Sequence, residues 1–178
     1  MKKSIGIVLL ILILTISMSA CGYNRIMREH LSDADNYTEY QVTVVGIACV
    51  DEQGNAHKEY TNEQLASAER VFLDVTFASK AELSPFLGVS EQGIANDPST
   101  YTIRLQINAE NHKVLVQNGF YDAVKAGDEI TVTASNWIYM DGEFFYVIGV
   151  ACGEQVYLNP TVGLQNVIGM MKKQRGLL

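Results

Sequence analysis

Alternation of apolar and polar residues in two stretches is the feature that most constrains the fold of this chain. In residues 71–77 and again in residues 101–107, the odd positions are apolar: Val71, Leu73, Val75, Phe77, Tyr101, Ile103, Leu105 and Ile107. Successive side chains of a strand point to opposite faces of the sheet, so a period of two predicts a strand with one buried face. Both stretches are therefore expected to be half-buried strands.

Three further stretches have strand-forming sequences. Residues 40–50 are rich in residues that favour strands and contain Gly46, which indicates a bulge or a bend. Residues 129–140 and 143–151 flank Asp141-Gly142, a dipeptide typical of a two-residue hairpin turn. The sequence thus predicts strands at five places.

Capping signals indicate where helices begin. Thr61 and Gln64 have the spacing of a capping box, which predicts a short helix before the strand at 71–77. Asn108 can cap a helix that ends at Asn118-Gly119, after the third strand and before the fourth. Asn159-Pro160 favours the start of a final helix, and four of its apolar residues fall on one face, namely Leu164, Val167, Ile168 and Met171. This amphipathic C-terminal helix is expected to pack against the strands.

Taken together, these elements resemble an OB-fold. The resemblance rests on the bent first strand with Gly46, the Gly127-Asp128 lead-in to the fourth strand, and the helix between strands three and four. It covers residues 40–152 and implies a mainly β fold, a five-stranded OB-like β-barrel, to which the C-terminal helix is added. The alternative is another small β-barrel or an α+β roll with the same number of strands.

The first twenty residues have the pattern of a signal peptide. Lys2 and Lys3 precede an apolar run over residues 5–16, shorter than the ~20 residues that a membrane-spanning helix needs. Met18-Ser19-Ala20-Cys21 resembles the lipobox of bacterial lipoproteins, which implies that Cys21 is acylated and holds the protein at the extracytoplasmic face of the cell membrane. An uncleaved N-terminal anchor is the alternative, because no charge lies between Lys3 and Arg25. Ordinary secretion would leave Cys21 unexplained.

Charge limits the partners of the predicted mature chain. We expect residues 1–20 to be removed, residues 21–39 to form a polar tether, and residues 40–178 to form one globular domain. Without the signal peptide the chain has 11 basic and 20 acidic residues, a formal charge of −9. So acidic a domain is a poor candidate for nucleic-acid binding, and it is repelled by anionic lipids. Membrane contact is therefore expected through the acyl chains on Cys21.

The residues that most often carry chemistry do not form a predicted site. Cys49 and Cys152 could form a disulfide outside the cytoplasm, or could remain two buried free thiols. The three histidines, His30, His57 and His112, lack metal-ligand spacing and are expected to be solvated. We therefore predict no catalytic residues, no metal site and no cofactor.

The predicted hairpin supplies a candidate binding face. Pairing across Asp141-Gly142 places Trp137, Tyr139, Phe144 and Tyr146 on one face and Ile130, Val132, Ile138, Phe145 and Val147 on the other. The favoured interpretation is that the C-terminal helix covers the four aromatic residues, and a bulge would instead turn them into the core. The functional interpretation is that they join the long segment 79–100 in a groove for a sugar, a peptide or a partner protein.

A binding function is preferred over catalysis on these grounds. The sequence predicts a non-catalytic binding or protein-interaction module at the cell envelope, with an envelope protein or a small ligand as its partner. The alternative is an envelope enzyme of the hydrolase type that uses carboxylates of the 79–100 loop, such as Glu82, Glu91 and Asp97.

Overall fold

A computed structural model describes residues 28–50, 56–68, 70–77, 102–135 and 145–174. Over these ranges the protein is mainly β and ends in a long helix, as predicted. Its strands are β1 (Tyr37–Val50), β2 (Ala56–His57), β3 (Arg70–Thr76), β4 (Thr102–Asn108), β5 (Glu129–Ser135), β6 (Phe145–Cys152) and β7 (Gln155–Leu158). Its helices are a 3-10 turn (Ala34–Asn36), α2 (Asn62–Ser67), α3 (Ala109–Gln117), α4 (Phe120–Ala123) and α5 (Pro160–Gln174), and residues 28–32 are also helical.

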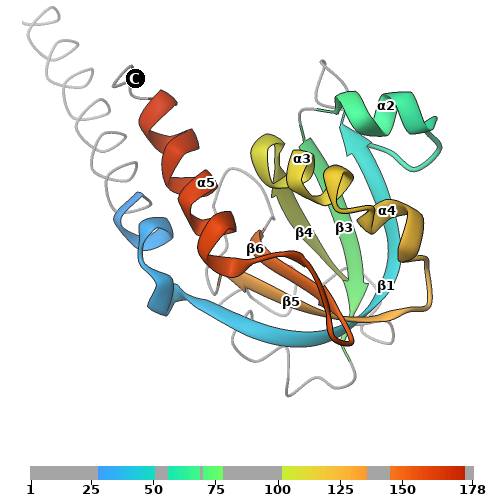
Figure 1. Cartoon of the computed structure of the whole chain (residues 1–178), viewed down its shortest axis with the longest axis horizontal. Coiled ribbons are helices and arrows are strands. Elements are labelled where there is room, and N and C mark those ends of the chain that lie inside the picture. The colour runs from blue at the N-terminus through green and yellow to red at the C-terminus, as the bar shows by residue number, and fades with distance from the viewer. Residues whose placement is uncertain (1–27, 51–55, 69, 78–101, 136–144, 175–178) are drawn as a thin grey trace, which may run out of the picture.

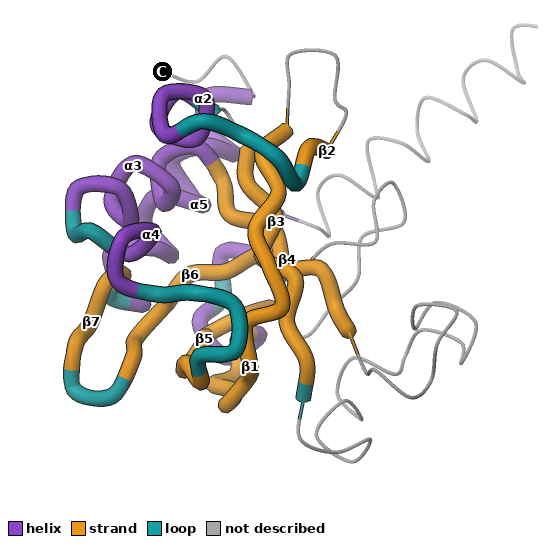
Figure 2. Tube along the Cα trace, turned by 90° about the vertical axis from the view of Figure 1, so that its right-hand side faces the viewer, coloured by secondary structure: helices purple, strands orange, loops and turns teal. Residues whose placement is uncertain are grey.

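The strands form a ring because β1 pairs along both of its edges. Antiparallel pairing joins β1 to β3 and β3 to β4, and β4 then meets β6 in parallel over two residue pairs, Leu105 with Phe145 and Gln106 with Tyr146. β6 pairs with β5, and β5 returns to β1 from Tyr37 to Thr43. In Figure 2 the helices gather on one side of these strands. The sequence did not predict two short strands, β2, which pairs with β1, and β7, which pairs with β6.

Gly46 marks a bulge in β1, as the sequence predicts. The register with β3 pairs Val44 with Val75 and Gly46 with Asp74, so Val45 is the extra residue. A bulge of this kind bends its strand and increases the local twist. The bend lets one strand pair with β5 in its first half and with β3 in its second half.

Residues before position 40, which were predicted to belong to the polar tether, already pack as part of the domain. β1 starts at Tyr37 instead of residue 40, and Leu31 before it is fully buried. The Tyr37 hydroxyl donates a hydrogen bond of 2.9 Å to the Leu31 carbonyl oxygen. Leu31 and Tyr37 share an apolar cluster with Val167 and Met171 of α5. The segment before β1 is thus fixed against the C-terminal helix.

The inside of the ring holds the main core. The odd positions of β3 and β4 point into it, as their alternation predicts, together with Ile130, Val132, Phe145 and Val147 of β5 and β6. The prediction of a half-buried strand is wrong for β3, because Phe72 and Asp74 on its other face are only 4% and 5% exposed. Asp74 accepts two hydrogen bonds from Arg104, which lies opposite it on β4, at 2.7 and 2.9 Å. This bidentate pair satisfies the buried carboxylate.

The predicted capping signals operate in the structure. Thr61 and Gln64 form the capping box of α2, and the Asn108 side chain accepts a hydrogen bond of 2.9 Å from the Asn111 amide at the start of α3. α3 ends before Gly119, whose φ of 73° lies in the left-handed region that favours glycine. Local sequence therefore sets where these helices begin and end.

α5 lies close against β6 on one side of the ring (Figure 1). Gly163 makes this possible, since a Cβ at that position would overlap the Ile148 carbonyl group. Asn111 of α3 is fully buried, and its side-chain amide donates to the carbonyl oxygens of Val147 at 3.0 Å and Gly163 at 3.3 Å. Asn166 of α5 donates to the Asn111 side-chain oxygen at 2.9 Å. The Asn111 side chain thus connects α3, β6 and α5 through hydrogen bonds.

Candidate functional site

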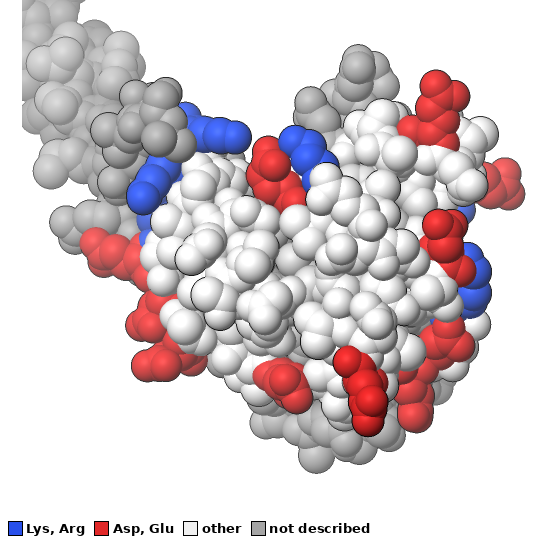
Figure 3. Space-filling view, viewed as in Figure 1, with Lys and Arg blue, Asp and Glu red and all other residues white. Residues whose placement is uncertain are grey.

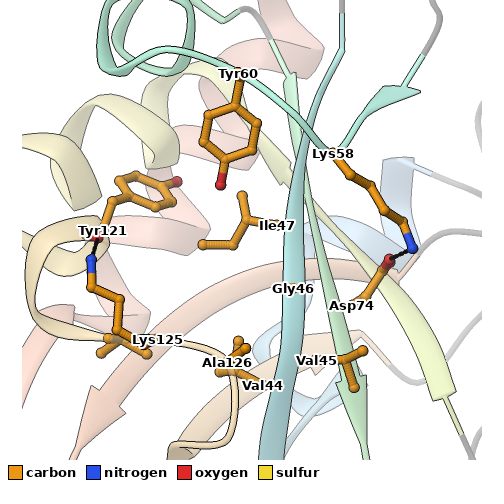
Figure 4. A pocket seen from close by; sticks show the side chains of 11 residues that line it. Val44, Val45, Gly46, Ile47, Lys58, Tyr60, Asp74, Tyr121, Lys125 and Ala126 are labelled. Carbon is orange, nitrogen blue, oxygen red and sulfur yellow. Dashed lines mark hydrogen bonds and ion pairs between the residues drawn. The ribbon is translucent and has the colours of Figure 1, made fainter.

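A pocket of about 380 Å³ opens beside the bulge of β1 (Figure 4). Residues 44–47 of β1 form one wall, and Lys58 and Tyr60, which precede α2, form another. Tyr121 of α4, residues 124–126 of the turn to β5, and Asp74 of β3 complete it. The volume lies within the usual range of small-ligand sites.

His112 fixes the hydrogen bonding of one pocket tyrosine. Its Nε2 lies 2.6 Å from the carbonyl oxygen of Leu65, which can only accept, so Nε2 carries the hydrogen. Burial lowers the pKa of His112, and in the resulting neutral ring Nδ1 accepts a hydrogen bond of 2.7 Å from the Tyr121 hydroxyl. Because the Tyr121 hydroxyl donates its hydrogen to His112, its oxygen can accept a hydrogen bond from a ligand.

The burial of His112 overturns the prediction that all three histidines are solvated. Its side chain is only 1% exposed, and it lies on the same face of α3 as Leu115, which is fully buried. Residues three positions apart share a helix face, so the pair His112 and Leu115 was a signal in the sequence for an inward-facing histidine.

The second pocket tyrosine and a nearby thiol also stay uncharged near neutral pH. Tyr60 and Tyr121 direct their hydroxyl groups into the same space beside Ile47 (Figure 4). Burial raises the pKa of both phenols, and it raises the pKa of the Cys49 thiol to about 11. The two tyrosines therefore offer neutral hydrogen-bonding groups to the pocket.

The rim of the pocket is basic although the protein is acidic. The Lys58 side chain is 74% exposed, and its Nζ lies 3.9 Å from an Asp74 oxygen that Arg104 already engages. Nζ of Lys125 donates to the uncharged backbone oxygen of Tyr121 at 2.7 Å. On the face shown in Figure 3, acidic side chains are spread over much of the margin of the molecule. Two lysines at one pocket are thus a local exception in a chain with a formal charge of −7.

A smaller pocket adjoins the first at Tyr121. Its volume is about 230 Å³, and it lies between Leu65 and Ala66 of α2 and the Gly119 turn. Since Tyr121 lines both pockets, a change at this residue affects both.

Of the predicted aromatic face, the structure describes only Tyr146. This side chain is half-buried and packs against the cluster of Leu31, Ile148 and Val167 beside α5, whereas its neighbours Phe145 and Val147 point into the core. Burial raises its pKa. The other three members, Trp137, Tyr139 and Phe144, lie outside the described residues, as do Cys21, the turn Asp141-Gly142, and the 79–100 segment with Glu82, Glu91 and Asp97. A binding face at these residues stays a prediction.

The two cysteines of the domain are free thiols in the structure. The Cys152 thiol donates to the carbonyl oxygen of Glu129 at 3.6 Å, and Glu129 pairs with Thr43 of β1. Thr43 and Cys49 are about 20 Å apart along an extended strand. A disulfide needs its Cα atoms within about 7 Å, so this register separates the two thiols.

Within the described ranges, no cluster of three or more His, Cys, Asp or Glu residues is placed to hold a metal ion. In the same residues, no helix combines the length and apolar character needed to cross a membrane.

The pocket itself was not predicted. Its side chains come from segments that are distant in the sequence, and Tyr60, Tyr121 and Lys125 fit no local motif. Gly46 was the one lining residue with a sequence signal. Comparison of the chain with known protein families, curated proteins and solved structures finds no match.

Proposed function

We propose that this protein is a lipid-anchored, extracytoplasmic binding module without catalytic activity, whose ligand site is the pocket beside Gly46. The observation that carries the binding function is the state of the pocket's polar groups. Of the side chains that line the pocket, Tyr60 and Tyr121 remain protonated because burial raises their pKa values, and Asp74 is engaged by two hydrogen bonds from Arg104. Next to the pocket, both ring nitrogens of His112 are engaged. General acid–base catalysis requires a group whose pKa lies near the working pH.

The strand pairings support an OB-like barrel as the framework of this module. The pairings run β1–β3–β4–β6–β5 and return to β1, and α3 lies between β4 and β5 as the resemblance implies. β2 and β7 are then short additions to the five strands. The bend at Gly46 belongs both to the barrel and to the pocket wall, so fold and site depend on the same residue.

Filling the pocket tests the binding function. A Cβ at Gly46 would meet nothing within 4 Å, and Gly46 pairs with Asp74, so Gly46→Leu should place its side chain on the Asp74 side of the pocket without unfolding the domain. Ligand-observed NMR with a mixture of monosaccharides, amino acids and dipeptides should detect binders of the wild type that the variant loses. Val162→Leu, at a residue of α5 that is 42% exposed, is the matched control and should bind as the wild type does. Equal binding by Gly46→Leu would refute the pocket as the site.

Lipid anchoring rests on Cys21 and is tested separately. Cys21→Ala should abolish incorporation of labelled palmitate and leave either an uncleaved precursor or a released protein. Mass spectrometry of the membrane fraction distinguishes these states. If neither processing nor membrane association changed, residues 5–20 would be an uncleaved anchor and the lipoprotein assignment would be wrong.

A further inference from the structure

One edge of β1 is unpaired beside the pocket. On the side away from β3, the ladder with β5 ends at Thr43, and two more hydrogen bonds join Val44 to Gly127 and Asp128 at 2.8 and 2.9 Å. Pairing on this side resumes with β2 at Cys49 and Val50. Between these points, over residues 45–48, no strand in the described part of the chain pairs with this edge.

The gap has the dimensions of a short strand. Four residues in extended conformation span ~13 Å, and alternate residues direct their N–H and C=O groups toward the open edge. Residues 45–47 also form a wall of the pocket, so the space beside the edge is hollow instead of filled by side chains. Past the bulge at Val45, the backbone groups of residues 46–48 match the backbone of another extended chain better than they match the hydroxyls of a sugar ring.

The charged side chains at the pocket indicate which side chains such a peptide would carry. The pocket is lined by Lys58 and Lys125, and in the described residues no carboxylate forms an ion pair with Lys125. The Asp74 carboxylate, which lies 3.9 Å from Lys58 Nζ, already has two hydrogen bonds from Arg104. The Tyr121 oxygen, whose own hydrogen goes to His112, faces the same space and can accept from a backbone N–H.

We propose that the pocket takes an extended peptide with acidic side chains, which adds as a strand to the edge of β1 over residues 45–48. This inference rests on the proposed binding function and names the ligand class of the same site. The main chain of the peptide would supply most of the affinity, and Lys58 and Lys125 would select acidic residues.

The probe is the blocked peptide acetyl-Glu-Val-Glu-amide, short enough for the ~13 Å gap, added to the full chain in phospholipid nanodiscs. Fluorescence anisotropy measures binding of a labelled copy, and hydrogen exchange followed by mass spectrometry measures backbone protection. Binding should slow amide exchange in the segment that contains residues 45–48 by tenfold or more. Two N-methylated peptides, one for each set of alternate amides, should differ from each other, because only one set faces the strand edge.

Variants separate the charge and backbone contributions. Lys58→Gln and Lys125→Gln should each weaken binding roughly two- to fivefold, as expected for exposed ion pairs. Lys172→Gln on α5 is the control and should bind like the wild type. A peptide with lysine in place of glutamate should bind more weakly than the acidic probe.

Failure of this inference is distinguishable from failure of the proposed function. If small molecules bind in a Gly46-dependent manner while the acidic peptide does not, strand addition is wrong and the binding module stands. Strand addition is also wrong if both N-methylated peptides bind as well as the unmodified one, or if exchange in the segment stays unchanged. If Gly46→Leu alters the binding of no ligand, both proposals fall.

Discussion

Two regions of the strand ring, the α5 side and the pocket side, are built in opposite ways. On one side α5 lies directly against β6, with Gly163 touching the Ile148 backbone and Asn111 satisfying carbonyl groups of both elements. At the bulge of β1, a pocket of about 380 Å³ is lined by β1 and by Tyr121 of α4. Each region contains a glycine: a Cβ at Gly163 would overlap the Ile148 carbonyl group, whereas a Cβ at Gly46 would meet no atom within 4 Å. The same residue type thus lies at a close backbone contact in one region and beside open space in the other.

This difference indicates where the protein tolerates a larger side chain. At α5 the backbones are in contact and a buried polar group fixes their separation, so any added volume must displace the helix. At the pocket, added volume enters empty space. Substitutions of the same size should therefore give very different losses of stability on the two sides, and this is open to direct measurement.

The largest expected effect is that of Gly163→Ala. Because the added methyl group would overlap the Ile148 carbonyl, α5 must shift, and we expect a loss of about 3 kcal/mol in unfolding free energy. Urea unfolding followed by circular dichroism measures it. Gly169→Ala on the same helix meets nothing within 4 Å and should instead stabilise the protein by up to about 1 kcal/mol. Equal behaviour of the two variants would contradict the close contact.

Asn111→Ala should have the next largest effect. It removes the hydrogen bonds that a fully buried side chain makes to Val147, Gly163 and Asn166, at a cost of about 2 kcal/mol. Asn166→Ala, which removes only one of these bonds from a half-buried position, should cost less. The same urea experiment ranks the two, and a reversed order would show that the network does not centre on Asn111.

A smaller effect is expected from pH on the pocket side. Burial lowers the folded-state pKa of His112 below its usual value of 6.5, so the unfolded chain binds more protons at mildly acidic pH. The contribution of neutral His112 to stability is complete above pH 6.5 and is lost as the pH falls through the folded-state pKa. His112→Gln should therefore reduce the difference in unfolding free energy between pH 7.5 and pH 5.5.

His30 requires its own control in that experiment, because burial also lowers its pKa while Asp33 raises it. His30→Gln is measured beside His112→Gln at both pH values. An unchanged pH dependence in His112→Gln would mean that this histidine is not held neutral.

The smallest effect should be that of Gly46→Ala. Its methyl group would meet no atom within 4 Å, so the unfolding free energy should stay within about 0.5 kcal/mol of the wild type. A loss as large as that of Gly163→Ala would show that the bulge tolerates only glycine, and the contrast between the two sides would disappear.

Local patterns in the sequence predicted much of the framework. The alternation at 71–77, the capping box at Thr61 and the bulge at Gly46 each depend on neighbours within a few residues, and all three are found in the structure. β7 was missed because it has only four residues, although Gly153 before it, with φ of 56°, allows the tight turn from β6.

Features that depend on distant partners could not be predicted in this way. Asp74 looked like a solvent-facing position of β3, and its burial becomes intelligible only with Arg104 opposite it on β4. The pocket is the extreme case, because Tyr60 and Tyr121 approach one another only once β1, α2 and α4 are assembled.

The double pairing of β1 has a consequence for how the domain forms. The first half of this strand pairs with β5, and the Gln41 side chain donates to the Thr131 hydroxyl across 90 positions of sequence at 2.7 Å. Contacts so distant in sequence slow folding, to the range of milliseconds to seconds that is usual for β-rich domains. β1 can therefore complete its pairing with β5 only after most of the chain has been synthesised. Until then its unpaired edges can pair with other chains, which favours aggregation. Synthesis and folding of this domain are accordingly expected to be successive events.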